Sequence, residues 1–376
     1  MASIVMRKIK NIYHWVRSWF WVFYYGYPAK ELTVIGVTGT DGKTTTCNLI
    51  YEILRAAGYK AGLISTVWAK IDGKEFSLRL HVTNPEASIL QKLLRQMVDE
   101  GCTHVVLEVT SHGLDQNRVV GCNFKIGVLT NITHEHFDYH KTMEEYVAAK
   151  AKLFRKVEYA LLPNSQISSN SQIIKYSKTR IKNINPSLAG EYNKYNIGAA
   201  EAVAKILGVN QRTVNQLIRN FAGVPGRREE IKMGQKFRCI VDFAHTPNAL
   251  EQLLVSLRRE TKNKIILIFG CTGERDKEKR PVMGGIADRY ADEVVVTTDD
   301  VRSESQDEIY EQIVNGMRRK PYREDDRDRA IEMGVKMARA GDIVVASGMG
   351  HEQTQLIGKT EVHRSDKMAF ANALKT

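Results

Sequence analysis

The stretch LTVIGVTGTDGKTTTCNLI, residues 32–50, decides the fold of this chain. Its first seven residues are mostly β-branched or apolar and predict a buried strand, and its last residues continue into a helical pattern. Between them, TGTDGKTTT (38–46) has the composition of a phosphate-binding loop at a helix N-terminus. Counted from Gly39, the loop is shorter than the usual GxxxxGK[ST] pattern. Because a strand precedes it and a helix follows it, we interpret it as a nucleoside-triphosphate site rather than a chance turn.

Individual residues of this loop have distinct expected roles. Gly39 and Gly42 permit backbone N–H groups to converge on phosphate oxygens. Lys43 neutralises the β- and γ-phosphates, and the Thr44 hydroxyl ligates Mg²⁺. The residues predicted to bind the nucleotide here are Gly39, Thr40, Asp41, Gly42, Lys43, Thr44 and Thr45.

Similar strand-like runs follow on the C-terminal side of the loop. THVVLEV (103–109) and FKIGVLTNI (124–132) repeat the pattern, and residues 86–100 and 143–155 are helical in pattern. Short β-branched runs that alternate with helices are typical of a parallel sheet covered on both faces.

A second series of strand-like runs begins after Pro225-Gly226 and comprises CIVDFAH, KIILIFG, EVVVTT and DIVVASG. We therefore predict an α/β protein with two domains. A central P-loop ATPase-type, doubly wound domain spans residues 32–226, and a smaller Rossmann-like domain spans residues 227–376.

Composition narrows the classes of function. The chain has 376 residues, a length that fits two domains, and 55 Lys+Arg against 43 Asp+Glu give a charge of +12. A net positive charge is typical of proteins that bind nucleic acid, an anionic membrane or phosphate-rich substrates, and of proteins whose surface is simply basic. Nucleic acid is not expected, because no nucleic-acid-binding module is visible and the cations are spread along the chain. The five scattered cysteines form no CxxC pair and favour a reducing, cytoplasmic compartment.

The first 31 residues differ from the rest of the chain. They hold Trp15, Trp19 and Trp21, three of the four tryptophans, and carry a net charge of +4 from five cations and Glu31. Aromatic rings mixed with cations suit the headgroup level of a membrane and predict a peripheral membrane contact through residues 1–31. The alternative is a helix whose aromatic side chains pack on the next domain.

Acidic and imidazole side chains follow the later strands of the first series. Glu108 ends the run 103–109, and His134, Glu135, His136, Asp138 and His140 follow the run 124–132. In a parallel sheet these ends lie beside the phosphate loop. The nearby phosphate loop favours Mg²⁺ around a triphosphate. Zinc held by the HxH spacing, or histidines in a solvated loop, are the alternatives.

Several long motifs, taken together and in order, resemble the Mur ligases. These are TGTDGKTTT, LEVTSHGLDQNRV, TNITHEHFDYHKTMEEYVAAKAKLF, GEYNKYNIGAA and GVPGRREE. In the second half, VDFAHTPNALE, FGCTGERDKEKRPVMGGIA, TTDDVRSES and GMGHE are similar to the MurE-like branch. That branch, UDP-N-acetylmuramoyl-tripeptide synthetase, adds the third residue of the peptidoglycan stem peptide. The resemblance covers about residues 32–376.

The resemblance implies an ATP- and Mg²⁺-dependent ligase that forms an amide bond through an acyl phosphate. By resemblance, Thr44 and Glu108 hold one Mg²⁺, and Glu108 and His136 hold a second. Lys150, in YVAAK, matches a lysine that is carbamylated in this family and then serves as an anionic metal ligand. The implied catalytic residues are Lys43, Glu108, His136, Lys150 and Arg227.

The resemblance also implies substrate contacts. The further positions for ATP are Asn193, Asn196, Arg227, Asp242 and His245. Those for a muramoyl-peptide-like acceptor are Thr83, Asn84, Thr110, Gln116 and Arg118. Those for the incoming amino acid are Arg275, Asp299, Asp300, Arg302, Gly348 and Glu352. Among these, the two arginines suit a carboxylate and Glu352 suits a distal ammonium.

Two departures from the family pattern leave alternatives open. The family carries an N-terminal domain that binds UDP, whereas only the 31-residue aromatic segment precedes the ATPase strand here. A ligase on a non-UDP acceptor, lipid-linked or an amino-acid polymer as in cyanophycin synthetase-like enzymes, is therefore the alternative function. The diaminopimelate signature DNPR is replaced by Asp299-Asp300-Val301-Arg302, so the amino acid stays open between diaminopimelate and another basic amino acid such as lysine. A nucleotide-binding protein with weak catalysis and a zinc hydrolase are the alternatives from other classes.

Overall fold

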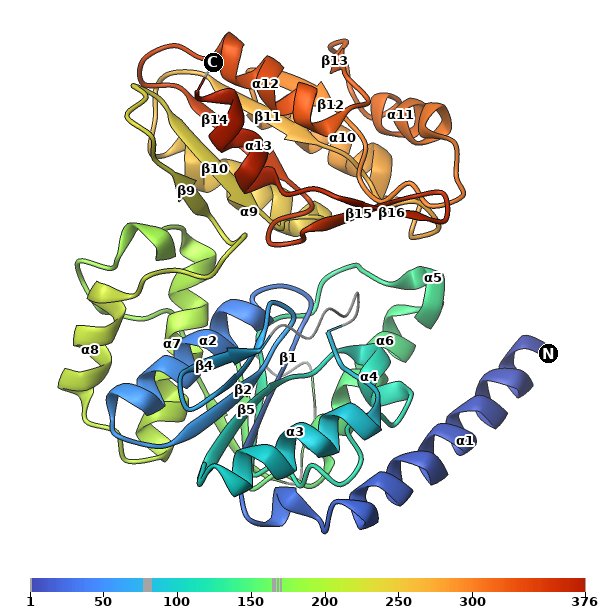
Figure 1. Ribbon diagram of the computed structural model, residues 1–376, viewed down its shortest axis with the longest axis vertical. Helices are drawn as coiled ribbons and strands as arrows, with labels where there is room; N and C mark the ends of the chain where they lie inside the picture. Colours follow the sequence, from blue (N-terminus) through green and yellow to red (C-terminus); the bar gives the residue numbers. More distant parts are fainter. Residues whose placement is uncertain (1, 77–82, 164–166, 168, 170, 376) are drawn as a thin grey trace. The chain divides into compact units, whose positions relative to one another are not determined.

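The computed structural model describes residues 2–76, 83–163, 167, 169 and 171–375, which form two compact units (Figure 1). The first unit comprises Met1–Ile184 and Tyr192–Asn220, and the second comprises Asn185–Glu191 and Phe221–Thr376. Each unit has its own sheet and its own hydrophobic core.

A sheet in the order β4-β3-β2-β5-β1-β6-β7-β8 forms the centre of the first unit. Its pairs are parallel except for β2–β3 and β3–β4, which are antiparallel. The strands are β1 (Thr33–Thr38), β2 (Ala61–Ile64), β3 (Ala69–Ile71), β4 (Lys74–Phe76), β5 (His104–Glu108), β6 (Ile126–Leu129), β7 (Tyr159–Leu162) and β8 (Gln172–Lys175).

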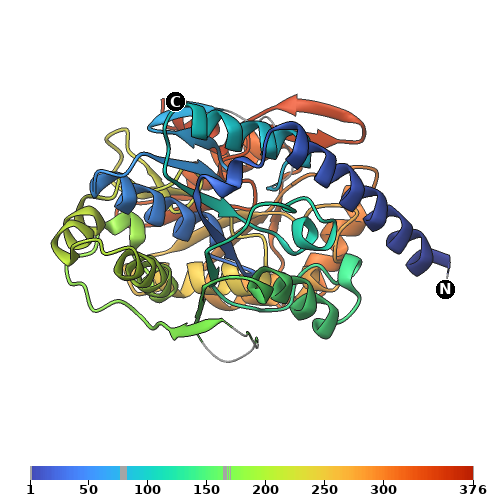
Figure 2. The same cartoon turned by 90° about the horizontal axis from the view of Figure 1, so that it is seen from below.

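Helices cover both faces of this sheet, as strand–helix alternation requires. They are α1 (Ala2–Tyr24), η1 (Pro28–Lys30), α2 (Lys43–Ala56), α3 (Ala87–Asp99), α4 (Ser111–Asp115), α5 (Phe137–His140), α6 (Met143–Ala151), η2 (Lys152–Arg155), α7 (Glu191–Ile206) and α8 (Gln211–Asn220). The helix α2 contacts β1, β2 and β5, and α3 packs on the opposite face (Figure 2).

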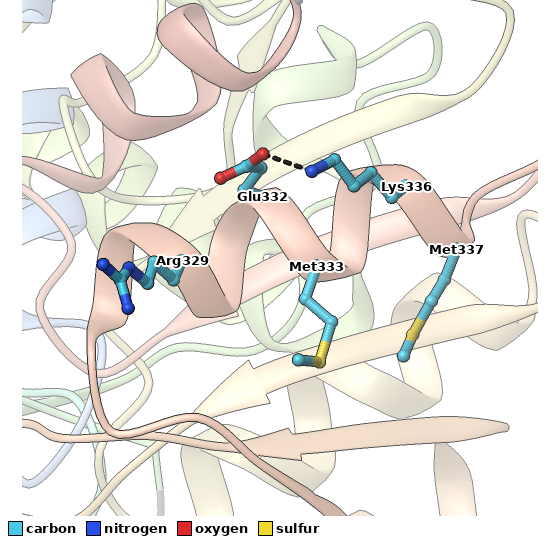
Figure 3. A pocket seen from close by; sticks show the side chains of 5 residues that line it. All are labelled: Arg329, Glu332, Met333, Lys336 and Met337. Carbon is cyan, nitrogen blue, oxygen red and sulfur yellow. Dashed lines mark hydrogen bonds and ion pairs between the residues drawn. The ribbon is translucent and has the colours of Figure 1, made fainter.

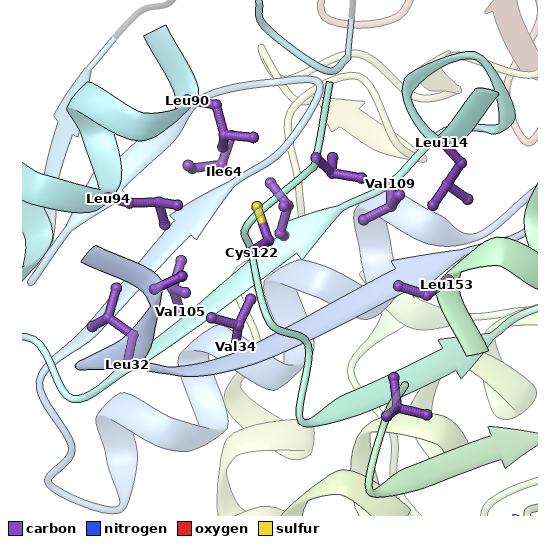
Figure 4. Packing of buried hydrophobic residues seen from close by; sticks show 14 of the residues in the cluster. Leu32, Val34, Ile64, Leu90, Leu94, Val105, Val109, Leu114, Cys122 and Leu153 are labelled. Carbon is purple, nitrogen blue, oxygen red and sulfur yellow. The ribbon is translucent and has the colours of Figure 1, made fainter. Parts of the chain in front are cut away.

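Apolar packing under α3 fixes the central strands. Val34 on β1 and Val105 on β5 belong to one fully buried cluster with Leu90 and Leu94 on α3 (Figure 4). Apart from Thr33 at its start, every residue of β1 is buried, which explains why its sequence is a continuous apolar run rather than an alternating one. This burial holds the C-terminal end of β1, where the phosphate loop begins, at the middle of the sheet edge.

The second unit contains a sheet in the order β13-β12-β11-β14-β10-β9, parallel except for the β9–β10 pair, and a separate two-stranded ribbon. The strands are β9 (Glu229–Ile231), β10 (Arg238–Asp242), β11 (Ile265–Phe269), β12 (Glu293–Val296), β13 (Tyr322–Arg323), β14 (Ile343–Ser347), β15 (Thr354–Ile357) and β16 (Thr360–His363).

Two apolar clusters cover the two faces of this second sheet. The helices α9, α10 and α11 pack on one face, and α12 and α13 pack on the other. The helices of this unit are η3 (Pro186–Leu188), α9 (Pro247–Arg258), α10 (Lys279–Tyr290), α11 (Gln306–Val314), α12 (Arg327–Met337) and α13 (Asp366–Ala373).

Buried ion pairs brace the loops at the C-terminal edge of the second sheet. Arg327 is fully buried and donates to both carboxylate oxygens of Asp366 at 2.7 Å, in the bidentate geometry that suits a guanidinium. Arg280, also fully buried, donates to Glu304 at 2.8 Å. This hydrogen bond is the main reason why the pKa of Glu304 falls to about 2.

Candidate active site

The phosphate loop of the first unit lies between β1 and α2 and depends on two glycines. Gly39 has φ of +151° and Gly42 has φ of +80°, in the region that favours glycine. A Cβ at Gly39 would collide with Thr130 Oγ1, and one at Gly42 would collide with Asn196 Oδ1. Both glycines are therefore required by close packing as well as by backbone conformation.

The loop following β6 braces the phosphate loop. Thr40 N donates to Asn131 O at 2.9 Å, and Asp41 N donates to Asn131 Oδ1 at 3.0 Å. The Thr130 hydroxyl donates to Asp41 O at 2.6 Å. These bonds fix the loop before any ligand binds, which reduces the entropy cost of forming a phosphate site.

Lys43 folds back over the same loop. Its Nζ donates to Gly39 O at 3.0 Å and to Thr40 O at 2.7 Å. The ammonium group is thus held at the mouth of the loop, where phosphate oxygens converge in sites of this type.

Glu108, at the end of β5, is the acidic partner of the loop. Its side chain is 1% exposed. The Thr44 hydroxyl donates to Oε1 at 3.1 Å, and Thr66 N donates to Oε2 at 2.9 Å. The structure therefore brings Thr44 and Glu108 together, although 64 positions separate them in the sequence.

Lys150 on α6 is 1% exposed and donates from Nζ to Gly39 O at 2.7 Å. Its ammonium lies 4.4 Å from the centroid of the Tyr146 ring. Burial, assisted by the nearby Lys43 charge, holds the pKa of Lys150 well below its ordinary value. A lowered pKa favours a neutral, nucleophilic amine next to the phosphate loop.

The histidine-rich loop lies on the same side of the unit. His136 adopts a left-handed conformation with φ of +62°, and its Nδ1 is 3.9 Å from Glu135 Oε1. The His136 ring is 6.3 Å from that of Tyr146, which also contacts Lys150. Tyr146 therefore connects the histidine loop with the lysine and with Thr40, whose hydroxyl is 3.1 Å from the Tyr146 hydroxyl.

Asn193 and Asn196, from α7, are buried beside the phosphate loop. Asn196 Nδ2 donates to Asn193 Oδ1 at 2.9 Å, and the Thr46 hydroxyl donates to Asn196 Oδ1 at 3.3 Å. The structure thus brings both asparagines to the start of α2, next to Gly42.

Three of the residues predicted to hold the acceptor gather around a fourth, Asn84. Thr110 N and the Thr110 hydroxyl both donate to Asn84 Oδ1 at 2.8 Å. Arg118 donates to Asn84 O at 2.9 Å. Asn84 Nδ2 donates to Glu108 O at 2.6 Å, so the group adjoins the predicted metal ligand. Thr83 is close by, and its hydroxyl is 3.0 Å from that of Thr66.

Gln116, the fifth residue predicted for the acceptor, follows α4. Its Oε1 is buried and has no hydrogen-bond partner among the described residues. A buried acceptor atom without a partner is costly in the free protein and is suited to a polar ligand group.

In the second unit, Asp242 organises the segment that carries Arg227 and His245. Asp242 accepts hydrogen bonds from Arg228 N at 2.7 Å and Ala244 N at 2.8 Å. Burial raises the pKa of Asp242, and the Arg227 charge opposes this rise. Arg227 lies 4.2 Å from the centroid of the Phe243 ring, and His245 Nδ1 is 2.8 Å from Phe243 O.

Three carboxylates gather at the C-terminal edge of the second sheet. Burial, followed by the charges of Asp299 and Asp300, raises the pKa of Glu352 well above its ordinary value. Gly348 has φ of +115°, and a Cβ there would approach Asp299 Oδ2 to 2.6 Å. The acidic group is therefore packed closely and is suited to a cation.

Arg302 and Arg275 lie on two loops that contact one another. Gly273 N donates to Asp300 O at 2.7 Å, which joins the loop before Arg275 to the loop before Arg302. Arg302 Nε is buried without a partner among the described residues, whereas Arg275 is exposed. Arg302 follows Asp300 by two positions, and the charges of Arg227 and Arg327 oppose the rise in the pKa of Glu352.

Sequence reasoning did not identify Thr66, Asn131 or Tyr146. Tyr146 precedes Lys150 by four residues, the helical spacing that puts two side chains on one face, and this spacing was a usable signal. Thr66 donates its backbone N–H to Glu108, and Asn131 accepts hydrogen bonds from the backbone of the phosphate loop. No residue pattern in the sequence predicts either contact.

The second unit also has a pocket along α12 (Figure 3). It is lined by Arg329, Glu332, Met333, Lys336 and Met337, and Glu332 forms an ion pair with Lys336. None of the residues predicted to bind substrates lines it.

Comparison with known proteins decides the family. Residues 37–167 match the Mur ligase middle domain, and residues 226–350 match the Mur ligase, glutamate ligase domain. A UDP-N-acetylmuramoyl-L-alanyl-D-glutamate–2,6-diaminopimelate ligase of Bacillus cereus is 38% identical over 93% of this chain and 79% of its own length. The corresponding ligase of Thermosynechococcus vestitus is 36% identical over 94% of this chain and 78% of its own length.

The chain belongs to the Mur ligase family. It is an ATP-dependent ligase that forms amide bonds. Solved structures agree with this Mur ligase fold. A diaminopimelate ligase structure gives a TM-score of 0.59 at 30% identity over 92% of this chain and 78% of its own. A Mycobacterium tuberculosis folylpolyglutamate synthase gives 0.75 at 16% identity over 96% of this chain and 95% of its own, a likeness of fold alone.

Proposed function

We propose that this ligase joins an amino acid to the carboxylate of a muramoyl-peptide-like acceptor during synthesis of peptidoglycan precursors. An acceptor carboxylate oxygen attacks the γ-phosphorus of ATP, the bond to the bridging oxygen breaks, and ADP leaves. The amine of the incoming amino acid then attacks the acyl carbon, loses a proton and expels phosphate. The product is an amide together with ADP and phosphate.

The observation that carries this proposal is the buried group around the phosphate loop. Lys43 is held at the loop mouth, and Glu108 meets Thr44 at the end of the adjacent strand. Arg118 and Thr110 both donate to Asn84, and Asn84 Nδ2 donates to the Glu108 carbonyl oxygen. A triphosphate on the loop and an acceptor carboxylate near Thr110 would then lie on neighbouring strand ends, as ligands of parallel sheets do.

The residues present fit Mg²⁺. A carboxylate and a hydroxyl at the end of a phosphate loop are the hard oxygen donors that Mg²⁺ prefers. We propose Thr44 and Glu108 as protein ligands of one Mg²⁺, and Glu108 and His136 as those of a second. When bound, Mg²⁺ would neutralise charge on the phosphates during transfer.

The environment of Lys150 also suits a carbamate on its side-chain nitrogen. A neutral amine adds to the carbon of CO₂, forms an N–C bond and releases a proton, which leaves an anionic carbamate. The lowered pKa of Lys150 provides the neutral amine, and the adjacent Lys43 cation favours the anionic product.

The incoming amino acid is proposed to carry a second ammonium group. The raised pKa of Glu352 reflects burial beside Asp299 and Asp300, and a ligand cation would relieve that repulsion. Arg302 and Arg275 supply guanidinium groups for a carboxylate of the same ligand. The diaminopimelate ligases among the relatives are named for an amino acid of this type.

The test is phosphate release from ATP and Mg²⁺ with UDP-N-acetylmuramoyl-L-Ala-D-Glu and one amino acid at a time. Diaminopimelate and lysine carry a second ammonium, and norleucine is the matched control that lacks it. Mass spectrometry identifies the product. An amide formed with diaminopimelate or lysine but not norleucine supports the proposal. An amide formed equally with norleucine contradicts the role of Glu352, and phosphate release without any amide contradicts the acceptor.

A further inference from the structure

The helix α1 packs on the first unit through its polar side. The Ser18 hydroxyl donates to Asn117 O at 2.9 Å, and Asn117 Nδ2 donates to Asn11 O at 3.1 Å. Val22, fully buried, is the apolar part of this contact. The helix lies beside α3, and its N-terminal end extends past the rest of the unit in both views (Figures 1 and 2).

The opposite side of α1 presents large apolar side chains to solvent. We call this set the outer aromatic face, and its members, 49–67% exposed, are Ile12, Tyr13, Trp15, Val16, Phe20, Phe23 and Tyr24. At about 100° per residue they fill roughly half of the helix circumference. A surface helix of a globular protein normally has the reverse arrangement, with its apolar stripe on the core. A contiguous exposed patch of this kind marks an interaction surface.

Charge indicates what covers the outer aromatic face. Residues 1–30 contain no acidic residue, and their cations are Arg7, Lys8, Lys10, Arg17 and Lys30. Lys10 and Lys30 are exposed. A second copy of this helix would bring two cationic segments together, whereas an anionic lipid surface complements the charge.

The types of side chain point to a bilayer surface rather than a bilayer core. Tryptophan and tyrosine rings prefer the headgroup level, where an apolar body and a polar edge are both accommodated. Across the described residues, every helix is too short or too polar to cross a membrane. An amphipathic helix that bears cations and aromatic rings instead lies in the plane of the interface.

We propose that α1 docks this protein on the surface of an anionic lipid bilayer through the outer aromatic face. The proposal is independent of the ligase reaction proposed above. It has one consequence for that reaction, since Asn11 Nδ2 also donates to Asp115 Oδ2 at 3.3 Å, and Asp115 precedes Gln116. Docking would hold the loop that carries Gln116 and Arg118 about one helix diameter, ~10 Å, from the lipid surface.

The unmodified full chain provides the first test, because three of its four tryptophans are in α1 and the fourth is Trp68. Vesicles of phosphatidylcholine with phosphatidylglycerol should shift the tryptophan emission to shorter wavelength. Lipids brominated on the acyl chain should quench it. Phosphatidylcholine vesicles alone should bind more weakly, and salt should weaken binding to the anionic vesicles. An unchanged emission with anionic vesicles overturns the proposal.

A triple variant, Trp15→Ser, Phe20→Ser and Phe23→Ser, tests the outer aromatic face directly. Its partitioning onto anionic vesicles should fall by about 100-fold or more, because three rings no longer insert into the interface.

The matched control replaces three apolar side chains of similar exposure elsewhere, Ile173→Ser, Met233→Ser and Tyr322→Ser, and should bind as the unmodified chain does. Equal loss in both variants overturns the proposal. Sedimentation velocity without lipid tests the alternative that a second copy of the chain covers this face. If the unmodified chain self-associates and the α1 triple variant does not, the outer aromatic face binds a second copy, and docking on lipid is overturned.

Discussion

Replacing Glu108 with Gln separates the chemical role of this side chain from its structural role. The carboxylate accepts from the Thr44 hydroxyl at 3.1 Å and from Thr66 N at 2.9 Å. A glutamine amide can keep both contacts, since its oxygen accepts from Thr66 N and its nitrogen donates to the Thr44 oxygen. Glu108→Gln should therefore lower the free energy of unfolding by only about 1 kcal/mol or less.

Activity should respond quite differently to the same change. The variant loses the negative charge proposed to hold Mg²⁺, and turnover should fall by about 1,000-fold, or ~4 kcal/mol of transition-state stabilisation. The matched variant Glu108→Ala should lose activity to the same degree and also cost about 3 kcal/mol of stability. The larger cost arises because Thr66 N is left without an acceptor and a cavity opens at a side chain that is 1% exposed.

The assays are urea unfolding and ATP- and amino-acid-dependent phosphate release, each at several Mg²⁺ concentrations. A Glu108→Gln variant that keeps turnover within tenfold of the unmodified ligase would refute the metal assignment. A Glu108→Gln variant as unstable as Glu108→Ala would refute the hydrogen-bond exchange.

Three further predictions concern the phosphate loop and the second unit. Lys150→Ala should abolish phosphate release, and a short carboxylate such as acetate should restore part of it if a carbamate is the working group; no rescue contradicts the carbamate. Gly42→Ala should weaken ATP binding measured by calorimetry, because the added Cβ would collide with Asn196. The control Gly58→Ala has a similar φ of +88° and open space around it, so it should leave ATP binding unchanged. Equal effects of the two changes would contradict the packing argument. Glu304→Gln should cost about 2 kcal/mol of stability at neutral pH, because the folded-state pKa of about 2 lies below the ordinary 4.5. Since the unfolded chain binds that proton first, this difference should shrink as the pH falls from about 4.5 to 2, and a pH-independent difference in urea unfolding contradicts it.

The central strands were readable from the sequence because burial on both faces leaves an uninterrupted apolar run. The runs 103–109 and 124–132 are confirmed as β5 and β6, and the helical stretch 86–100 is confirmed as α3. The edge strand β4 gave no such signal. All three of its residues are exposed, two of them are charged and one is apolar. Their pairing depends on neighbours that the local sequence does not specify.

The contacts of the candidate site were likewise predictable from the sequence only in part. The meeting of Thr44 with Glu108 follows from strand order, because parallel strands end at one sheet edge. The buried positions of Arg280 and Arg327 could not be predicted, since an isolated arginine in a sequence is usually exposed. Both depend on acidic partners that are 24 and 39 positions away and that only the fold brings near.

The acyl-phosphate step is the central claim, and an isotope measurement tests it most directly. The acceptor is labelled with ¹⁸O in its reacting carboxylate and incubated with the ligase, unlabelled ATP, Mg²⁺ and the amino acid that gives an amide. Each turnover should transfer one ¹⁸O to the released phosphate, because the oxygen that attacks the γ-phosphorus leaves with it. Phosphate free of ¹⁸O, formed while the amide accumulates, would contradict the account.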